Sequence, residues 1–140
     1  MNRKALNETV QLQVGDLAPT FEQRPVFGLP VSVPTGNHTL VLLFIRHLGD
    51  PFARQTLSEV QARFSDFDRL GIKMAAITQT ELVMARDFVP RNHVLCPVVT
   101  DPEGLLQSRY GIGHDRFLLG SLKGIARGST SRLVAALNMG

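Results

Sequence analysis

Six consecutive apolar residues, Leu40 to Ile45, form a run that is too short for an ordinary helix and is rich in branched side chains. This pattern predicts a strand that is buried on both faces. Gly49 interrupts the run a few residues later. A second apolar run, Ile72 to Thr78, predicts another buried strand.

The segment between these two strands has the periodicity of one long amphipathic helix. Asp50 and Pro51 are a strong helix start, because an aspartate side chain accepts from a first-turn amide and proline fits the first helical position. Apolar residues then recur at spacings of four and three, which places one apolar stripe against a sheet. The stripe consists of Ala53, Leu57, Val60, Phe64 and Phe67, and Gly71 ends the helix. The order strand, helix, strand predicts a parallel pair.

Turn-forming residues dominate the segment before the first of these strands and predict a hairpin around Phe21 to Val33. After the second strand, a helix is expected from Gln79 to Pro90, where proline would end it. Its inward-facing residues are expected to be Leu82, Val83, Ala85, Phe88 and Val89. A short strand over Val94 to Thr100 and a short helix over Leu105 to Tyr110 follow, joined by the turn Asp101 to Gly104.

The chain after Gly113 has no second alternating pair of strands. Its apolar residues fit two helices, one over Phe117 to Ile125 and one over Leu133 to Leu137. The strand Leu40 to Ile45 would then have an uncovered edge, and such edges recruit another chain. A homodimer or a partner protein that covers this edge is therefore expected.

The segment FIRHLGDPFARQTLSEV resembles the part of AhpC/TSA-type peroxiredoxins, and of the peroxiredoxin-like branch in particular, that carries a Cys-Pro-Phe-Cys motif between strand and helix. VGDLAPTF, which begins at Val14, and the DPEG turn with its following Tyr-Gly extend the resemblance to about residues 14–113. The resemblance implies one thioredoxin-like α/β domain over residues 1–140, with a central mixed, mostly parallel sheet flanked by helices. The usual C-terminal strand pair would be missing or replaced by helices. The resemblance also implies that the relatives of this chain reduce peroxides with thiols or exchange thiols and disulfides.

Asp50 and Ala53 stand where the family motif has its two cysteines. A thiolate at a helix N-terminus reacts because the unpaired amides and the helix dipole lower its pKa. A carboxylate at the same place caps the helix but forms neither a sulfenic acid nor a disulfide. An N-cap is the favoured interpretation of Asp50, and a catalytic carboxylate is the alternative.

Two other features are candidate sites. Arg46, His47 and Arg54, together with Asp50 and the helix start, form a candidate binding site for a small anion. The alternative is that the two arginines neutralise Asp50 and its acidic neighbours. Cys96 is the one cysteine of the chain, and it is expected to be a small buried residue rather than a redox centre.

Composition narrows the choice of function. The chain has 140 residues, 44% of them hydrophobic, which suits one domain with a real core. The net charge is +3 and the pI about 9.6, but the arginines are scattered and there is no tryptophan, so no nucleic acid is expected. A single cysteine excludes an intrachain disulfide, and four separate histidines suggest no metal. No cofactor and no membrane association are expected, and the expected compartment is the cytoplasm.

Three hypotheses follow from these residues. The first is a thioredoxin-fold protein that has lost thiol chemistry at the usual site and acts as a binding or regulatory module. The second is a thiol oxidoreductase or peroxidase that works through Cys96 or through a partner's cysteine. The third is a protein that binds small anions through Arg46, His47, Arg54 and the helix N-terminus.

Overall fold

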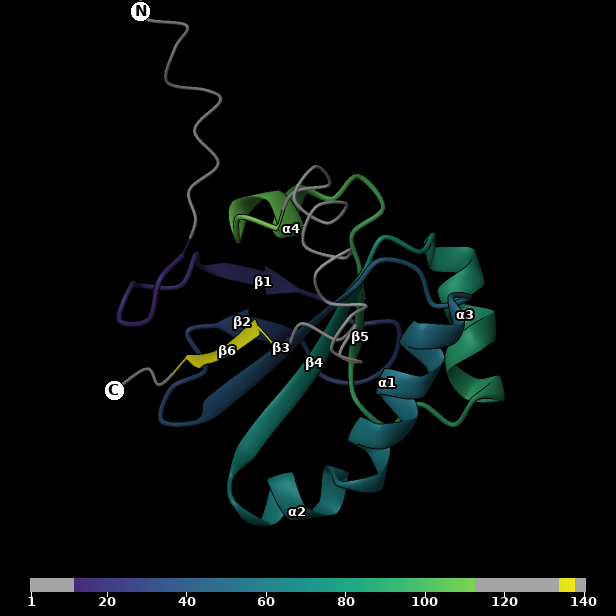
Figure 1. Cartoon of the computed structure of the whole chain (residues 1–140), viewed down its shortest axis with the longest axis horizontal. Coiled ribbons are helices and arrows are strands. Elements are labelled where there is room, and N and C mark those ends of the chain that lie inside the picture. The colour runs from purple at the N-terminus through teal and green to yellow at the C-terminus, as the bar shows by residue number, and fades with distance from the viewer. Residues whose placement is uncertain (1–11, 113–133, 138–140) are drawn as a thin grey trace, which may run out of the picture.

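The computed structural model describes residues 12–112 and 134–137 (Figure 1). The strands are β1 Phe21–Gln23, β2 Val31–Val33, β3 Thr39–Ile45, β4 Ile72–Thr78, β5 Val98–Thr100 and β6 Val134–Leu137. The helices are α1 Pro51–Ala62, α2 Phe64–Arg69, α3 Leu82–Arg91 and α4 Leu105–Arg109. The larger sheet has the strand order β5-β4-β3-β6, and β1 and β2 form a separate pair.

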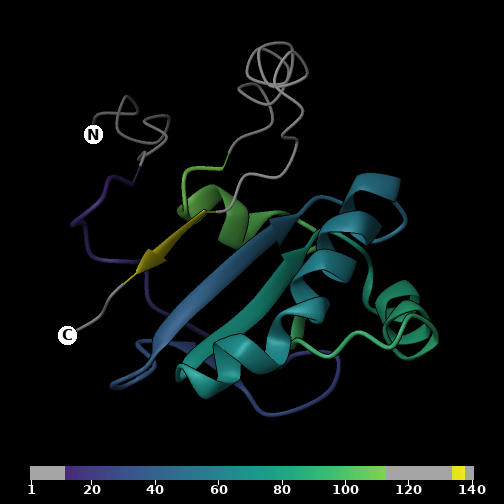
Figure 2. The same ribbon diagram turned by 60° about the horizontal axis from the view of Figure 1, so that its bottom comes forward.

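The centre of the fold is the parallel unit β3, α1, α2 and β4. The two strands pair in register from Thr39 opposite Ile72 to Ile45 opposite Thr78. β4 pairs in parallel with β5, so three parallel strands direct their carboxyl ends to the same edge, as the arrows for β3 and β4 show in Figure 2. The predicted thioredoxin-like α/β fold with a mostly parallel sheet is confirmed.

Both faces of this sheet are covered, which explains the continuous apolar sequence of β3. Leu40 and Leu42 face a cluster that includes residues of β1, β2 and α4. Val41, Leu43 and Ile45 face the other cluster, which is closed by α1 and α3 through residues such as Leu57 and Ala85. Figure 1 shows the helices α1, α2 and α3 on one side of the sheet and β1 and α4 on the other. A strand buried on both faces needs apolar side chains at every position.

The helix expected from residue 51 to 70 is two helices, which meet at Arg63. Arg63 leaves the helical conformation, with φ −112° and ψ 5°, and its N–H donates to the Val60 carbonyl at 3.1 Å. The apolar stripe is confirmed across this break. Leu57 is buried, and the other four members pack half-buried against the same cluster: Ala53, Val60, Phe64 and Phe67.

α3 differs from its prediction at both ends. It begins at Leu82 and continues through Pro90 to Arg91, so the proline does not end it. The end comes in a Schellman motif, in which His93 has a φ of 49°, the His93 N–H donates to the Pro90 carbonyl at 3.2 Å and the Val94 N–H donates to the Val89 carbonyl at 3.0 Å. This local cap is a stop signal that apolar periodicity does not contain.

The inward face of α3 is narrower than predicted. Ala85 and Val89 are buried and Phe88 is half-buried, as expected. The prediction that Leu82 and Val83 face inward is wrong, because their exposed fractions are 39% and 79%. A helix that begins at residue 82 and faces the sheet with residues 85, 88 and 89 turns residue 83 to the opposite side.

β5 is shorter than expected, so Cys96 lies just before the strand and not inside it. Pairing with β4 starts at Pro97, whose carbonyl accepts from the Ala76 amide at 2.8 Å. Proline has no amide with which to continue the ladder in the other direction. The hairpin prediction, in contrast, is confirmed, because β1 and β2 pair antiparallel with Phe21 opposite Val33.

The expected helix over Leu133 to Leu137 is wrong, because Val134–Leu137 is the strand β6. β6 pairs antiparallel with β3, with Leu40 opposite Leu137 and Leu42 opposite Val134. It therefore occupies the edge of β3 that was expected to need a partner chain. An apolar segment satisfies the backbone groups of such an edge more fully as a strand than as a helix. The helix expected over Phe117 to Ile125 lies outside the described residues.

None of the helices in the described part of the chain is long and apolar enough to cross a membrane.

Candidate functional site

Two loops meet at the carboxyl edge of the parallel sheet, and the candidate site is built on them. One follows β3 and leads into α1, and the other follows β4 and leads into α3. The Leu48 amide donates to Thr80 Oγ1 at 2.9 Å, and the Gln79 amide donates to the Arg46 carbonyl at 3.2 Å. Thr80 Oγ1 also lies 3.0 Å from Thr78 Oγ1. Leu48 and Thr80 are each only 1% exposed, so these buried bonds fix the path of both loops.

Asp50 is the N-cap of α1, as the sequence predicted. Its backbone is extended, with φ −68° and ψ 130°, and Pro51 occupies the first helical position. Asp50 Oδ1 accepts from the Phe52 amide at 3.0 Å, and the Asp50 carbonyl accepts from the Arg54 amide at 3.0 Å. The carboxylate thus already occupies the positive end of the helix, where a thiolate or a bound anion would be stabilised.

Ala53 lies one turn further along α1 and is half-buried against the cluster under the helix. Position 53 therefore lies beside position 50 in the first helical turn, the relation that the resemblance implied for the two cysteines. A methyl group there supplies packing and no chemistry. The start of α1 offers one carboxylate and no sulfur.

None of the three basic residues of the candidate anion site forms an ion pair with Asp50 in the described part of the chain. The Arg54 guanidinium points to α3, where it lies 5.6 Å from the centre of the Phe88 ring and 3.4 Å from Asn92 Oδ1. His47 Nδ1 accepts from the Gly49 amide at 3.1 Å, and the Arg46 side chain is exposed.

Arg54 therefore contacts a ring and an amide, which is neither the anion site nor the alternative, a pairing with Asp50 or its acidic neighbours. Two ion pairs are formed within residues 12–112, Arg69 with Asp66 and Arg91 with Asp87, and both are local pairs along a helix.

Cys96 is buried, with an exposed fraction of 2%, in the cluster between the sheet and the helices α1 and α3. Burial raises the pKa of its thiol to about 11. The thiolate is the reactive form of cysteine, so this environment disfavours thiol chemistry at neutral pH.

Sequence reasoning missed the pair Thr78 and Thr80, which are 0% and 1% exposed. The signal was a Thr-Gln-Thr segment at the end of a buried apolar strand, where threonine hydroxyls need partners. Among the residues that the structure describes, no three His, Cys, Asp or Glu side chains come together in a way that would hold a metal.

Solved structures of known proteins share this fold. Peroxidoxin BcpB from Mycobacterium tuberculosis matches with a TM-score of 0.63 and 18% identity over 69% of this chain and 64% of that one. A candidate thiol:disulfide interchange protein, DsbE, from Chlorobium tepidum matches with a TM-score of 0.66 and 21% identity over 74% of this chain and 73% of that one. Peroxiredoxin Q from Xanthomonas campestris matches with a TM-score of 0.59 and 18% identity over 64% of this chain and 58% of that one.

The chain thus spans less than two thirds of BcpB and of peroxiredoxin Q. At these identities the likeness concerns the fold.

No curated protein sequence matches the chain. The family model of the AhpC/TSA family matches residues 14–131, which is most of the sequence. This chain belongs to the AhpC/TSA family.

Proposed function

We propose that this protein is a member of the AhpC/TSA family that has lost thiol chemistry and acts by binding a partner protein. The observation that carries the proposal is the position of Asp50. Its carboxylate caps α1 through the Phe52 amide, at the place where the family motif has its first cysteine. The helix start is retained as a structural element, and a carboxylate stands in place of the nucleophile.

The remaining thiol is a poor substitute for that nucleophile. With a pKa of about 11, Cys96 is thiolate in only about one molecule in ten thousand at pH 7. Its exposed fraction of 2% also keeps a peroxide or a partner disulfide from the sulfur. Both facts weigh against the hypothesis of an oxidoreductase that works through Cys96.

A binding role is supported by apolar side chains at the same edge of the sheet. Phe52 in the first turn of α1 is 59% exposed, and Val83 and Met84 in the first turn of α3 are 79% and 53% exposed. The bonded loops described above bring these two helix starts to the same edge. Large exposed apolar side chains at one site favour a protein partner, which is either a second copy of the chain or another protein.

A site for a free anion is less well supported. An anion at the start of α1 competes with the Asp50 carboxylate for the Phe52 amide and is repelled by its charge. The test is a thermal shift with phosphate or sulfate in wild type and Arg46→Ala. The binding role predicts no saturable shift in either protein.

The loss of thiol chemistry is tested by peroxide consumption with a thiol reductant. Wild type and Cys96→Ser are expected to match buffer. The double variant Asp50→Cys, Ala53→Cys is the matched control, because it restores the family motif at the same helix start. Its N-cap thiol is expected to titrate well below the ordinary value of about 8.5, as followed by the pH dependence of alkylation.

Turnover by wild type that disappears in Cys96→Ser would establish the oxidoreductase instead. If the restored thiol titrates near its ordinary value, position 50 is not the family's cysteine position.

The partner is tested by light scattering. The chain has a mass of 15.4 kDa, and a homodimer would have twice that mass. If the partner is a second copy, Val83→Asp is expected to return the protein to the mass of one chain, because the substitution places a charge in the contact. If wild type has the mass of one chain at all concentrations, the partner that binds Phe52, Val83 and Met84 is a different protein.

A further inference from the structure

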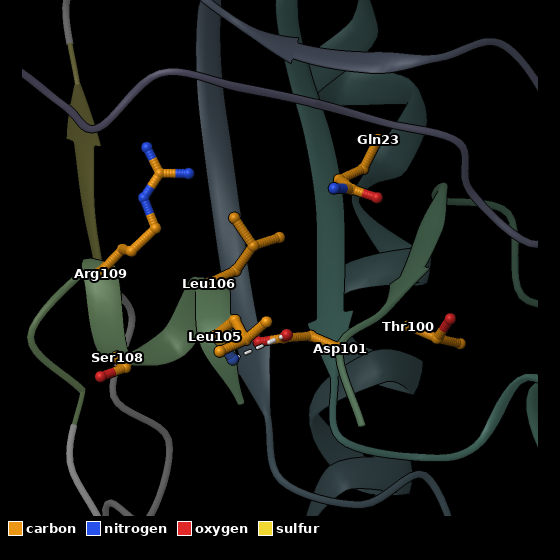
Figure 3. Close-up of a pocket in the computed structure, with 7 residues that line it drawn as sticks. All are labelled: Gln23, Thr100, Asp101, Leu105, Leu106, Ser108 and Arg109. Carbon is orange, nitrogen blue, oxygen red and sulfur yellow. Dashed lines mark hydrogen bonds between the residues drawn. The ribbon is translucent and has the colours of Figure 1, made fainter. Parts of the chain in front are cut away.

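A concave site lies on the opposite side of the sheet from α1 and α3, between α4, β1 and the end of β5. It has a volume of about 510 Å³, within the usual size range for pockets that hold small molecules. Figure 3 shows its lining, with the Arg109 guanidinium on one side of Leu106 and the Gln23 amide on the other. Neither Asp50 nor Cys96 lines this groove, so it is independent of the function proposed above.

Among the described residues that line the groove, Arg109 is the one cationic group. Arg109 Nη2 donates to the Thr20 carbonyl at 2.8 Å, which fixes the side chain against the segment before β1. A guanidinium has five N–H groups in a planar fork, so this single bond leaves others for a ligand.

The acidic residue of the lining, Asp101, is a second charged group, and Figure 3 shows it on the far side of Leu105 from Arg109. Asp101 is 7% exposed. Its two oxygens accept from the amides of Leu105 at 2.9 Å and Gln107 at 3.1 Å, the first of which is drawn in Figure 3.

The rest of the lining is apolar in the middle and neutral polar at the sides. Leu106 is buried and forms an apolar floor, while Leu105 presents a side chain that is 63% exposed. Gln23, Thr100 and Ser108 contribute an amide and two hydroxyls, which donate or accept without adding charge. Arg109 at one end of this apolar surface and Asp101 at the other suit a ligand that carries a negative charge at one end only, on an apolar chain.

We propose that this groove binds a small monocarboxylate with an apolar chain. The carboxylate pairs with the fork of Arg109, a geometry that matches carboxylates in bidentate fashion. The apolar chain lies on Leu105 and Leu106 and points from Arg109 towards Gln23. A phosphate dianion fits less well, because a single arginine balances only part of its charge.

The test is an NMR titration of the ¹⁵N-labelled full chain with sodium hexanoate at constant ionic strength. The expected result is a saturable shift of amide signals in α4 and around Gln23, with a Kd in the millimolar range that suits one exposed charge pair and a short chain. Hexanamide has the same chain without the charge and is expected to bind at least tenfold more weakly. Equal binding of hexanoate and hexanamide, or no saturable shift with hexanoate, would overturn the proposal.

Two pairs of variants locate the site. Arg109→Gln is expected to weaken hexanoate binding about tenfold, the usual effect of losing a hydrogen bond to a charged group. Arg69→Gln, at another exposed arginine, is expected to leave binding unchanged.

Arg109 also holds the Thr20 carbonyl, so Leu105→Asp provides a second test that leaves this contact in place. An acid at the start of α4 suits the helix but repels a carboxylate in the groove. Its control is Leu95→Asp, at a leucine that is 62% exposed elsewhere on the surface. Unchanged hexanoate binding in Arg109→Gln or in Leu105→Asp would show that the ligand lies elsewhere.

Discussion

Removing the side chain of Asp50 tests the geometry on which the proposed function depends. In the first turn of α1, Pro51 has no amide hydrogen and the Phe52 amide is satisfied by Asp50 Oδ1 at 3.0 Å. Asp50→Ala leaves that amide to water and is expected to cost about 1 kcal/mol of unfolding free energy, as for other N-caps. Asp50→Asn keeps an acceptor oxygen but loses the charge at the positive end of the helix. It is expected to cost about 0.5 kcal/mol.

The assay is urea unfolding of both variants and wild type, with Ser58→Ala on the exposed middle of α1 as a control for truncating a polar side chain. The control is expected to be neutral or slightly stabilising, since alanine is the better helix former. Added salt should shrink the difference between Asp50 and the asparagine variant and leave the difference between asparagine and alanine unchanged. If Asp50→Ala is as stable as wild type, the bond to Phe52 contributes nothing and the N-cap interpretation fails.

Three further predictions concern single residues outside α1. Thr80→Val leaves the Leu48 amide without its acceptor and should cost about 2 kcal/mol in urea unfolding, whereas Thr80→Ser should retain most of the stability. Gly104→Ala should cost about 1–2 kcal/mol, since φ is +69° and a Cβ would lie 2.8 Å from Gln79 Nε2; a neutral result would contradict this backbone conformation. Burial raises the pKa of Cys96 from 9.0 to about 11, so the unfolded state binds fewer protons above pH 9 and stability should fall by about 2 kcal/mol as pH rises through 11. In Cys96→Ala, the fall in unfolding free energy between pH 9 and pH 11 should be smaller by this amount. If wild type and Cys96→Ala lose the same stability over this range, the raised pKa of Cys96 is refuted.

The central unit of the fold was predictable because local and global preferences agree there. The continuous apolar run of β3 requires a strand covered on both faces, and the helix start at Asp50 follows it directly. The stripe from Ala53 to Phe67 has a helical period and faces the cluster beneath it. Each of these signals depends on residues near one another in the sequence.

The errors arose where a distant contact or a local cap decides the conformation. The segment Val134–Leu137 is apolar and short, and only its pairing with β3 makes it a strand. The end of α3 depends on the left-handed backbone of His93 and on the bonds from His93 and Val94 to the carbonyls of the last turn, and the helix runs past Pro90. Apolar periodicity contains neither piece of information.

The candidate site was predictable in position but not in its contacts. Asp50 was placed at the helix start from two residues of sequence. The direction of Arg54, by contrast, depends on Phe88 and Asn92, which lie on another helix. The groove beside Arg109 brings together residues from β1, β5 and α4, and no sequence pattern joins these segments.

The bond between the Leu48 amide and Thr80 has a consequence for substitutions at position 50. It anchors the loop before α1 from a position two residues upstream of Asp50, without using the side chain at position 50. The loop can therefore keep its shape while that side chain is exchanged. A substitution at position 50 therefore changes the chemistry of the helix start and leaves this anchor in place, so a protein engineer can install a new reactive group there.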